Sequence, residues 1–134
     1  MIDAQERVAA KRGLRTTGEP IPSLYRGRRR ANGDTVVTVN DTPLKHYVVH
    51  SPTGFEWGYG GSGPADLAIA ILVHHLKVKP LGPRPGFRWS GDGWDRVLAL
   101  YQDFKWQVIA QWPQEKDWVL WSDNIDDWLT ARKA

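Results

Sequence analysis

The chain contains no cysteine, which excludes disulfide bonds and thiolate metal sites. Its longest apolar run, Leu67 to Val73, is far shorter than the roughly 20 residues that a membrane-spanning helix needs. The first residues have mixed charge and lack the apolar segment of a secretory signal. No internal repeat or low-complexity tract is visible. These absences predict a cytoplasmic protein with no membrane partner.

A chain of 134 residues is long enough for one self-sufficient core. We expect an N-terminal arm over residues 1–23, made of a short helix and a linker, and a single domain over residues 24–134. Residues 1–30 carry eight basic and three acidic residues, whereas the remainder is net acidic. This asymmetry indicates either an anionic partner for the N-terminal part or a solvated basic strand.

The hydrophobic pattern alternates between strand and helix periods along the chain. Strands are predicted at residues 24–30, 35–39, 44–50, 55–58 and 117–121, and helices at 64–76, 94–112 and from 122 or 123 onward. The Asn32-Gly33 pair favours a tight hairpin between the first two strands. We therefore expect an α+β fold: an antiparallel β-meander of about five strands, a buried central helix, and two further helices packed on one face.

Eight tryptophans are a large excess for this length, and exposed aromatic residues often anchor binding surfaces. In the helix predicted over 94–112, the apolar stripe places Trp106 on the opposite face. If this helix has one exposed face, Trp106 lies on it. Burial under the C-terminal helix is the equal alternative. The Pro- and Gly-rich segment at 80–93 is predicted to be an irregular crossing.

The stretch Gly58-Tyr-Gly-Gly-Ser-Gly63 matches the glycine pattern of a dinucleotide site, between a predicted strand and a predicted helix. The acidic residue and second strand that complete such a site are missing, because no acidic residue occurs between Asp66 and Asp92. A simpler anion site remains, formed by the backbone N–H groups of Gly60, Gly61, Ser62 and Gly63. We favour the alternative that these glycines make a tight turn and allow close packing.

The four histidines predict neither a metal site nor a cofactor. His74 and His75 diverge by about 100° on a helix, and His46 and His50 would lie about 13 Å apart on a strand. His50 near Glu56 or Asp66 could carry out acid–base chemistry, although the favoured interpretation is a turn held by side-chain-to-backbone hydrogen bonds. No catalytic residue is assigned, and a non-enzyme is favoured.

Four arginines occur near the start of the predicted sheet. Arg26, Arg28 and Arg30 share one face of the first strand, and Arg29 faces the other way. Such a row could bind phosphates, or it could keep an edge strand soluble. Nucleic-acid binding rests on charge alone, since no zinc, RNP or helix-turn-helix pattern is present.

Several pieces together carry a family resemblance: YRGRR at 25–29, HSPTGFEWGYGGSGPADLA at 50–68, YQDFK at 101–105, Trp118 and the helix at 125–129. They resemble an uncharacterised family, a domain of unknown function, of small phage, plasmid and bacterial proteins. The resemblance implies no catalytic residues. It implies accessory proteins of mobile elements, in the host cytoplasm if phage-encoded, that often bind host or defence machinery.

Three functions stay open. The leading hypothesis is a non-enzymatic interaction protein of a phage or mobile element, with an anti-CRISPR inhibitor of a defence system as one form. Its partner contacts would be Trp106 and the acidic residues Asp123, Asp126 and Asp127, which could mimic nucleic acid. The second is a nucleic-acid-binding module that uses the arginine strand. The third is a small enzyme or a nucleotide- or anion-binding domain that uses the loop at 58–63.

Overall fold

The computed structural model describes residues 21–78 and 93–133. Nearly all of the predicted N-terminal arm and of the crossing at 80–93 therefore lies outside the described residues. The elements, in chain order, are β1 (Leu24–Arg29), β2 (Thr35–Val39), β3 (Thr42–Pro43), α2 (Ser62–Leu76), α3 (Trp94–Gln107), the 3₁₀ turn η1 (Ile109–Gln111), β4 (Trp118–Trp121) and α4 (Ser122–Lys133).

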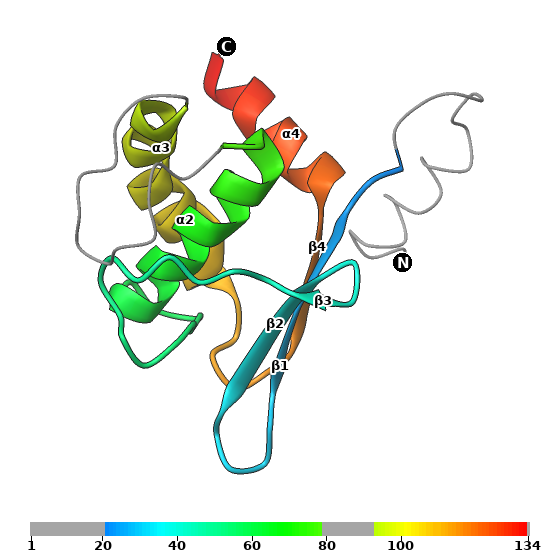
Figure 1. Ribbon diagram of the computed structural model, residues 1–134, viewed down its shortest axis with the longest axis vertical. Coiled ribbons are helices and arrows are strands. Elements are labelled where there is room, and N and C mark those ends of the chain that lie inside the picture. The colour runs from blue at the N-terminus through cyan, green and yellow to red at the C-terminus, as the bar shows by residue number, and fades with distance from the viewer. Residues whose placement is uncertain (1–20, 79–92, 134) are drawn as a thin grey trace.

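The four strands form one antiparallel sheet in the order β3-β2-β1-β4, with the helices gathered beside it (Figure 1). The hairpin between β1 and β2 closes where the sequence predicted it, at the Asn-Gly pair. Gly33 has φ of 93°, a conformation that glycine adopts without steric cost, and its N–H donates to the carbonyl of Arg30. The α+β architecture is thus confirmed.

The two faces of the sheet differ in character because strand side chains alternate. One face packs against the helices through the buried residues Tyr25, Val37, Val39, Trp118 and Leu120. The other face is formed by half-buried or exposed residues, namely Leu24, Arg26, Arg28, Val36, Thr38, Val119 and Trp121. The domain therefore has one closed and one open sheet face within its described part.

Helix α2 is the centre of the core. Every residue from Gly63 to Val73 is buried, and α3 packs along this helix. Burying each large aliphatic side chain contributes about 1.5–3 kcal/mol, so α2 supplies much of the driving force for folding. No helix of the described ranges is long and apolar enough to cross a membrane.

Helix α3 follows the predicted stripe. Trp94, Val97 and Phe104 are almost fully buried, whereas Trp106 is 54% exposed on the opposite side. Of the two alternatives left open by the sequence, exposure of Trp106 is therefore the one found. The helix ends earlier than expected, at Gln107, and its last predicted turn has 3₁₀ geometry.

The sheet has four strands where about five were predicted, and two of the predicted strand segments were misplaced. Residues 44–50 and 55–58 form no strand, while the short β3 lies at Thr42–Pro43, where a turn was expected. For the segment at 44–50 the reason is tertiary. The backbone N–H groups of Val49, His50 and Ser51 donate to the side chain of Asp66, so they are not available for a ladder of strand hydrogen bonds.

Candidate functional site

Asp66 is a fully buried carboxylate in the first turns of α2. It accepts hydrogen bonds from the backbone N–H groups of His50 and Ser51 (both 2.9 Å) and, more weakly, from Val49 (3.3 Å). The ring Nε2–H of His46 donates to the same carboxylate at 2.8 Å. A buried charge needs such partners, and here they tie the loop at 46–51 to the core helix.

The four histidines are spread over separate hydrogen bonds. His46 contacts Asp66, and His50 bonds through its ring to the hydroxyl of Tyr101 at 3.0 Å. His74 and His75 point to different partners, as their helical spacing predicts. Among residues 21–78 and 93–133, no group of three or more His, Cys, Asp or Glu residues is arranged to hold a metal ion. The pairs instead join segments that are distant in sequence.

Arg29 and Glu56 form a two-bond ion pair on the helix-facing side of the sheet. The guanidinium group also donates to the carbonyl oxygens of Gln114 and Gly33 and lies 4.8 Å from the ring centroid of Trp57. The hydrogen bond from Arg29 lowers the pKa of the Glu56 carboxyl. Arg29 therefore cross-links three loops, and its N–H donors are used in hydrogen bonds within the protein.

Two exposed aromatic rings lie against the glycine-rich loop at 58–63, one from the loop itself and one from α3. Tyr59 is 41% exposed, Trp106 is 54% exposed, and each lies against a glycine. A Cβ atom on Gly60 would lie 2.0 Å from the ring of Trp106, and one on Gly61 would lie 2.3 Å from the ring of Tyr59. The ammonium of Lys105 donates to the carbonyl of Gly60 and lies 4.6 Å from the centroid of Trp106. We call Tyr59 and Trp106 the aromatic pair.

The same loop offers little to an anion. Gly61 is the N-cap of α2, and no side chain caps it. Gly63 is buried against the side chain of Glu56, where a Cβ would lie 2.7 Å from the Glu56 Cβ. The side chain of Glu56 therefore occupies the space beside the start of the helix, and its carboxylate is bonded to Arg29. The predicted anion site at Gly60, Gly61, Ser62 and Gly63 is therefore less favoured by the geometry than close packing.

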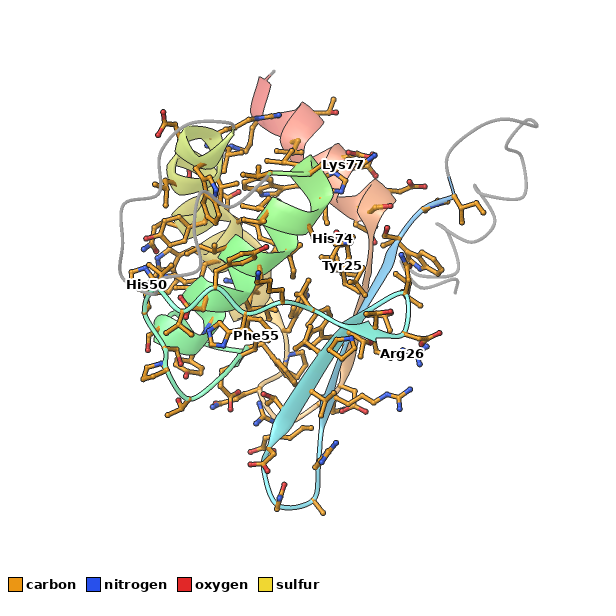
Figure 2. All side chains as sticks on the ribbon, viewed as in Figure 1. Tyr25, Arg26, His50, Phe55, His74 and Lys77 are labelled. Atoms are coloured by element: carbon orange, nitrogen blue, oxygen red, sulfur yellow. The ribbon has the colours of Figure 1, made fainter. Side chains whose placement is uncertain are left out.

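The open sheet face carries the other three predicted arginines. Arg26 projects away from α2 (Figure 2), and Arg28 follows two residues later on the same face. With Arg30, directly after β1, they form what we call the arginine row. In the described part of the chain no carboxylate pairs with any of the three. Beside the row lies a hollow of about 570 Å³ lined in part by Asp117 and Val119.

The acidic residues near the C-terminus are less available than the sequence suggested. Asp126 accepts a hydrogen bond from Nε2–H of His75 at 2.7 Å, which joins α4 to the end of α2. Asp123 and Asp127 have contacts of their own. A nucleic-acid mimic needs free carboxylates in a row, so this surface is a weaker candidate than the arginine row.

The chain matches the model of a family of unknown function, DUF6166, over residues 25–131. The chain belongs to this family. A search of curated proteins and a search of solved structures found no match. Membership supports the predicted resemblance over most of the described domain but assigns no activity to any DUF6166 residue.

Sequence reasoning missed the two tightest polar clusters, which are Asp66 with its loop and Arg29 with Glu56. From the sequence, Glu56 and Asp66 are candidates only as acid–base partners of His50. One signal was present for Asp66, since it is the lone charged residue in an otherwise apolar helix. An isolated charge in a buried helix indicates an internal hydrogen-bond partner. Which segment supplies that partner is not visible without the fold.

Proposed function

We propose that this protein acts by binding rather than catalysis, and that a single-stranded nucleic acid lies on the open face of its sheet. The observation that carries the proposal is the arginine row, because three cations on one face have no described acidic partner. Alternate strand residues are about 6.7 Å apart, so the row spans about 13 Å. Cations at this spacing suit successive phosphates of an extended strand.

The shape of the surface favours a single strand over a duplex. Open faces of four-stranded antiparallel sheets bind unpaired bases in known RNA-binding modules, whereas a DNA major groove admits a helix or a two-stranded ribbon. Aliphatic side chains of Val36 and Val119 lie beside the arginines and offer apolar surface to bases. Arg29 is excluded from this interface, because its guanidinium pairs with Glu56 on the other side.

Fluorescence anisotropy with a labelled oligothymidylate, titrated at several salt concentrations, tests the proposal. Three phosphate contacts predict a slope of log affinity against log salt of about −2 for a single strand. The double variant Arg26→Ala with Arg28→Ala should leave a slope of about −0.7. A matched double variant, Arg96→Ala with Lys116→Ala, removes two exposed charges elsewhere and should behave like the wild type. Absence of binding at low salt, or equal loss in both double variants, contradicts the proposal.

A protein partner is the second candidate, and the aromatic pair favours it. Exposed Trp and Tyr side chains held in place by glycines lose little entropy on binding, which is typical of interface anchors. Under this second hypothesis, the protein is an accessory factor of a phage or mobile element that binds host or defence machinery. An anti-CRISPR inhibitor is one example of such a factor. Affinity purification from bacterial lysate should recover a partner with the wild type and with Gln107→Ala, but not with Trp106→Ala. If Trp106→Ala recovers as much of the partner as the wild type does, the aromatic pair is not the binding surface.

A catalytic or nucleotide-binding role for the loop at 58–63 is the least supported alternative. The Glu56 side chain lies beside the helix N-terminus but is paired with Arg29, and the His50 ring bonds to Tyr101. Thermal-shift screening against nucleotides and divalent metals tests it. A rise in melting temperature on ligand addition that is lost when Ser62 or Gly63 is substituted would support this role.

A further inference from the structure

A cavity of about 580 Å³ lies between the C-terminal half of α2 and the segment that leaves β2 and β3. Its floor is apolar, since Val39, Leu44, Val73 and Val78 are all at least nine-tenths buried. The volume falls within the range of about 300–1,000 Å³ that is typical of small-molecule sites. This cavity is separate from the arginine row, which lies on the other face of the sheet.

Two lysines stand at the edge of the cavity. Lys45 comes from the segment after β3, and Lys77 comes from the end of α2, so the cavity lies between them. Both side chains are exposed, and neither has an acidic partner among the described residues. The Lys45 ammonium lies 5.2 Å from the ring centroid of Tyr47. An apolar floor with two unpaired cations at its edge is complementary to an amphipathic anion.

The backbone conformation of Lys77 independently indicates that its side chain takes part in binding. This residue is the C-cap of α2 and has left-handed geometry, with φ of 55° and ψ of 44°. Glycine is the usual residue in such a conformation, because a Cβ atom is disfavoured there. Non-glycine residues held in this region cluster at ligand sites. A lysine in place of glycine suggests that the side chain is retained for a contact of its own.

His74 also lines this cavity and adds a hydrogen-bond donor to it. The hydroxyl of Tyr25 lies 2.6 Å from Nδ1 of His74, and burial together with the Asp126 charge raises the pKa of Tyr25. The phenol therefore keeps its proton, and its O–H donates a hydrogen bond to Nδ1. Burial and the charges of His75 and Lys77 lower the pKa of His74, which leaves a neutral ring with its own proton on Nε2. Figure 2 places Tyr25, His74 and Lys77 together at this end of α2.

We propose that this cavity binds a small organic anion with an apolar body. The body lies on the floor formed by Val39, Leu44 and Val73, and the acid group accepts hydrogen bonds from Lys45, Lys77 and Nε2–H of His74. No bond is made or broken. The site is independent of nucleic-acid binding, so either proposal can fail without the other.

The fluorescent anion anilinonaphthalene sulfonate is a suitable probe, and phenylnaphthylamine, which lacks the acid group, is its neutral counterpart. Titrations of the full chain should give saturable binding of the sulfonate at one site. Lys45→Ala and Lys77→Gly should each weaken it about fivefold, the loss expected for one partly exposed charge contact. Affinity for the neutral probe should not change. Lys116→Ala, which removes an exposed lysine elsewhere, should bind the sulfonate as the wild type does.

Lys77→Gly also separates binding from folding. Glycine accepts the left-handed backbone better than lysine, so this variant should melt at the same or a higher temperature while it loses affinity. Absence of saturable wild-type binding overturns the proposal. Unchanged sulfonate affinity in both lysine variants, or an equal loss in Lys116→Ala, overturns it as well.

Discussion

Replacement of Asp66 by alanine should be among the most destabilising single changes in this domain. The substitution removes the acceptor of two 2.9 Å backbone hydrogen bonds, from His50 and Ser51, and of the ring N–H of His46. Ser51 is buried, so water cannot easily replace the lost carboxylate on its side of the loop. Hydrogen bonds to a charged group contribute about 1.5–3 kcal/mol each, and an unpaired buried donor costs a similar amount.

The His50 and His46 groups are partly accessible to water, so the contributions do not add in full. We expect Asp66→Ala to lower the free energy of unfolding by about 4 kcal/mol, and Asp66→Asn by about 2 kcal/mol. Asparagine keeps one oxygen acceptor but turns an N–H₂ group toward the remaining donors. For a chain of this length, about 3–4 °C of melting temperature is lost per kcal/mol. The alanine variant should therefore melt about 12–16 °C below the wild type.

Urea unfolding followed by circular dichroism measures these differences, provided that the variants share the wild-type m-value, the slope of the free energy of unfolding against urea concentration. Asp103→Ala is the matched control, because Asp103 is paired with Arg132 on the surface and is about half exposed. This control should lower the free energy of unfolding by at most about 1 kcal/mol. His46→Ala should cost less than Asp66→Ala, since it leaves the backbone bonds to the carboxylate in place. If Asp66→Ala is no more costly than Asp103→Ala, the assigned role of the buried carboxylate is wrong.

Two further predictions concern the ion pair and the aromatic pair. Because the Arg29 hydrogen bond lowers the pKa of Glu56, the stability that this carboxylate provides is present above its ordinary pKa and is lost as pH falls through the lowered value. Between pH 7 and pH 3, the wild type should lose about 1–2 kcal/mol more than Glu56→Gln does; an equal loss would contradict this role. Gly60→Ala should cost about 1 kcal/mol by displacing the Trp106 ring, and this cost should vanish in a Trp106→Ala background; additive effects of the two changes would show that the close contact is unimportant.

The local part of this fold follows from sequence alone, because the interactions that define it lie within a few residues. The Asn32-Gly33 turn depends on backbone conformations that few residue types adopt. The apolar run of α2 and the stripe of α3 depend on helical periodicity, which also placed Trp106 opposite the stripe. That the C-terminal helix leaves this face uncovered was decided by the tertiary structure. The alternation of Arg26 and Arg28 with Arg29 depends on the strand period of two.

Tertiary structure alone decided which charged groups are available to a partner. Residues 44–50 have strand-like composition, yet the backbone N–H groups of His50 and of the following Ser51 donate to Asp66. That choice depends on a carboxylate many residues later in the chain. Arg29 resembles its neighbours in sequence, but only the approach of Glu56 turns it into an internal link. The glycines of the loop at 58–63 have the spacing of a phosphate site, and their packing against Tyr59, Trp106 and Glu56 appears only when α3 is in place. Pairing between distant segments is set by the global packing of the core, which local sequence patterns do not encode.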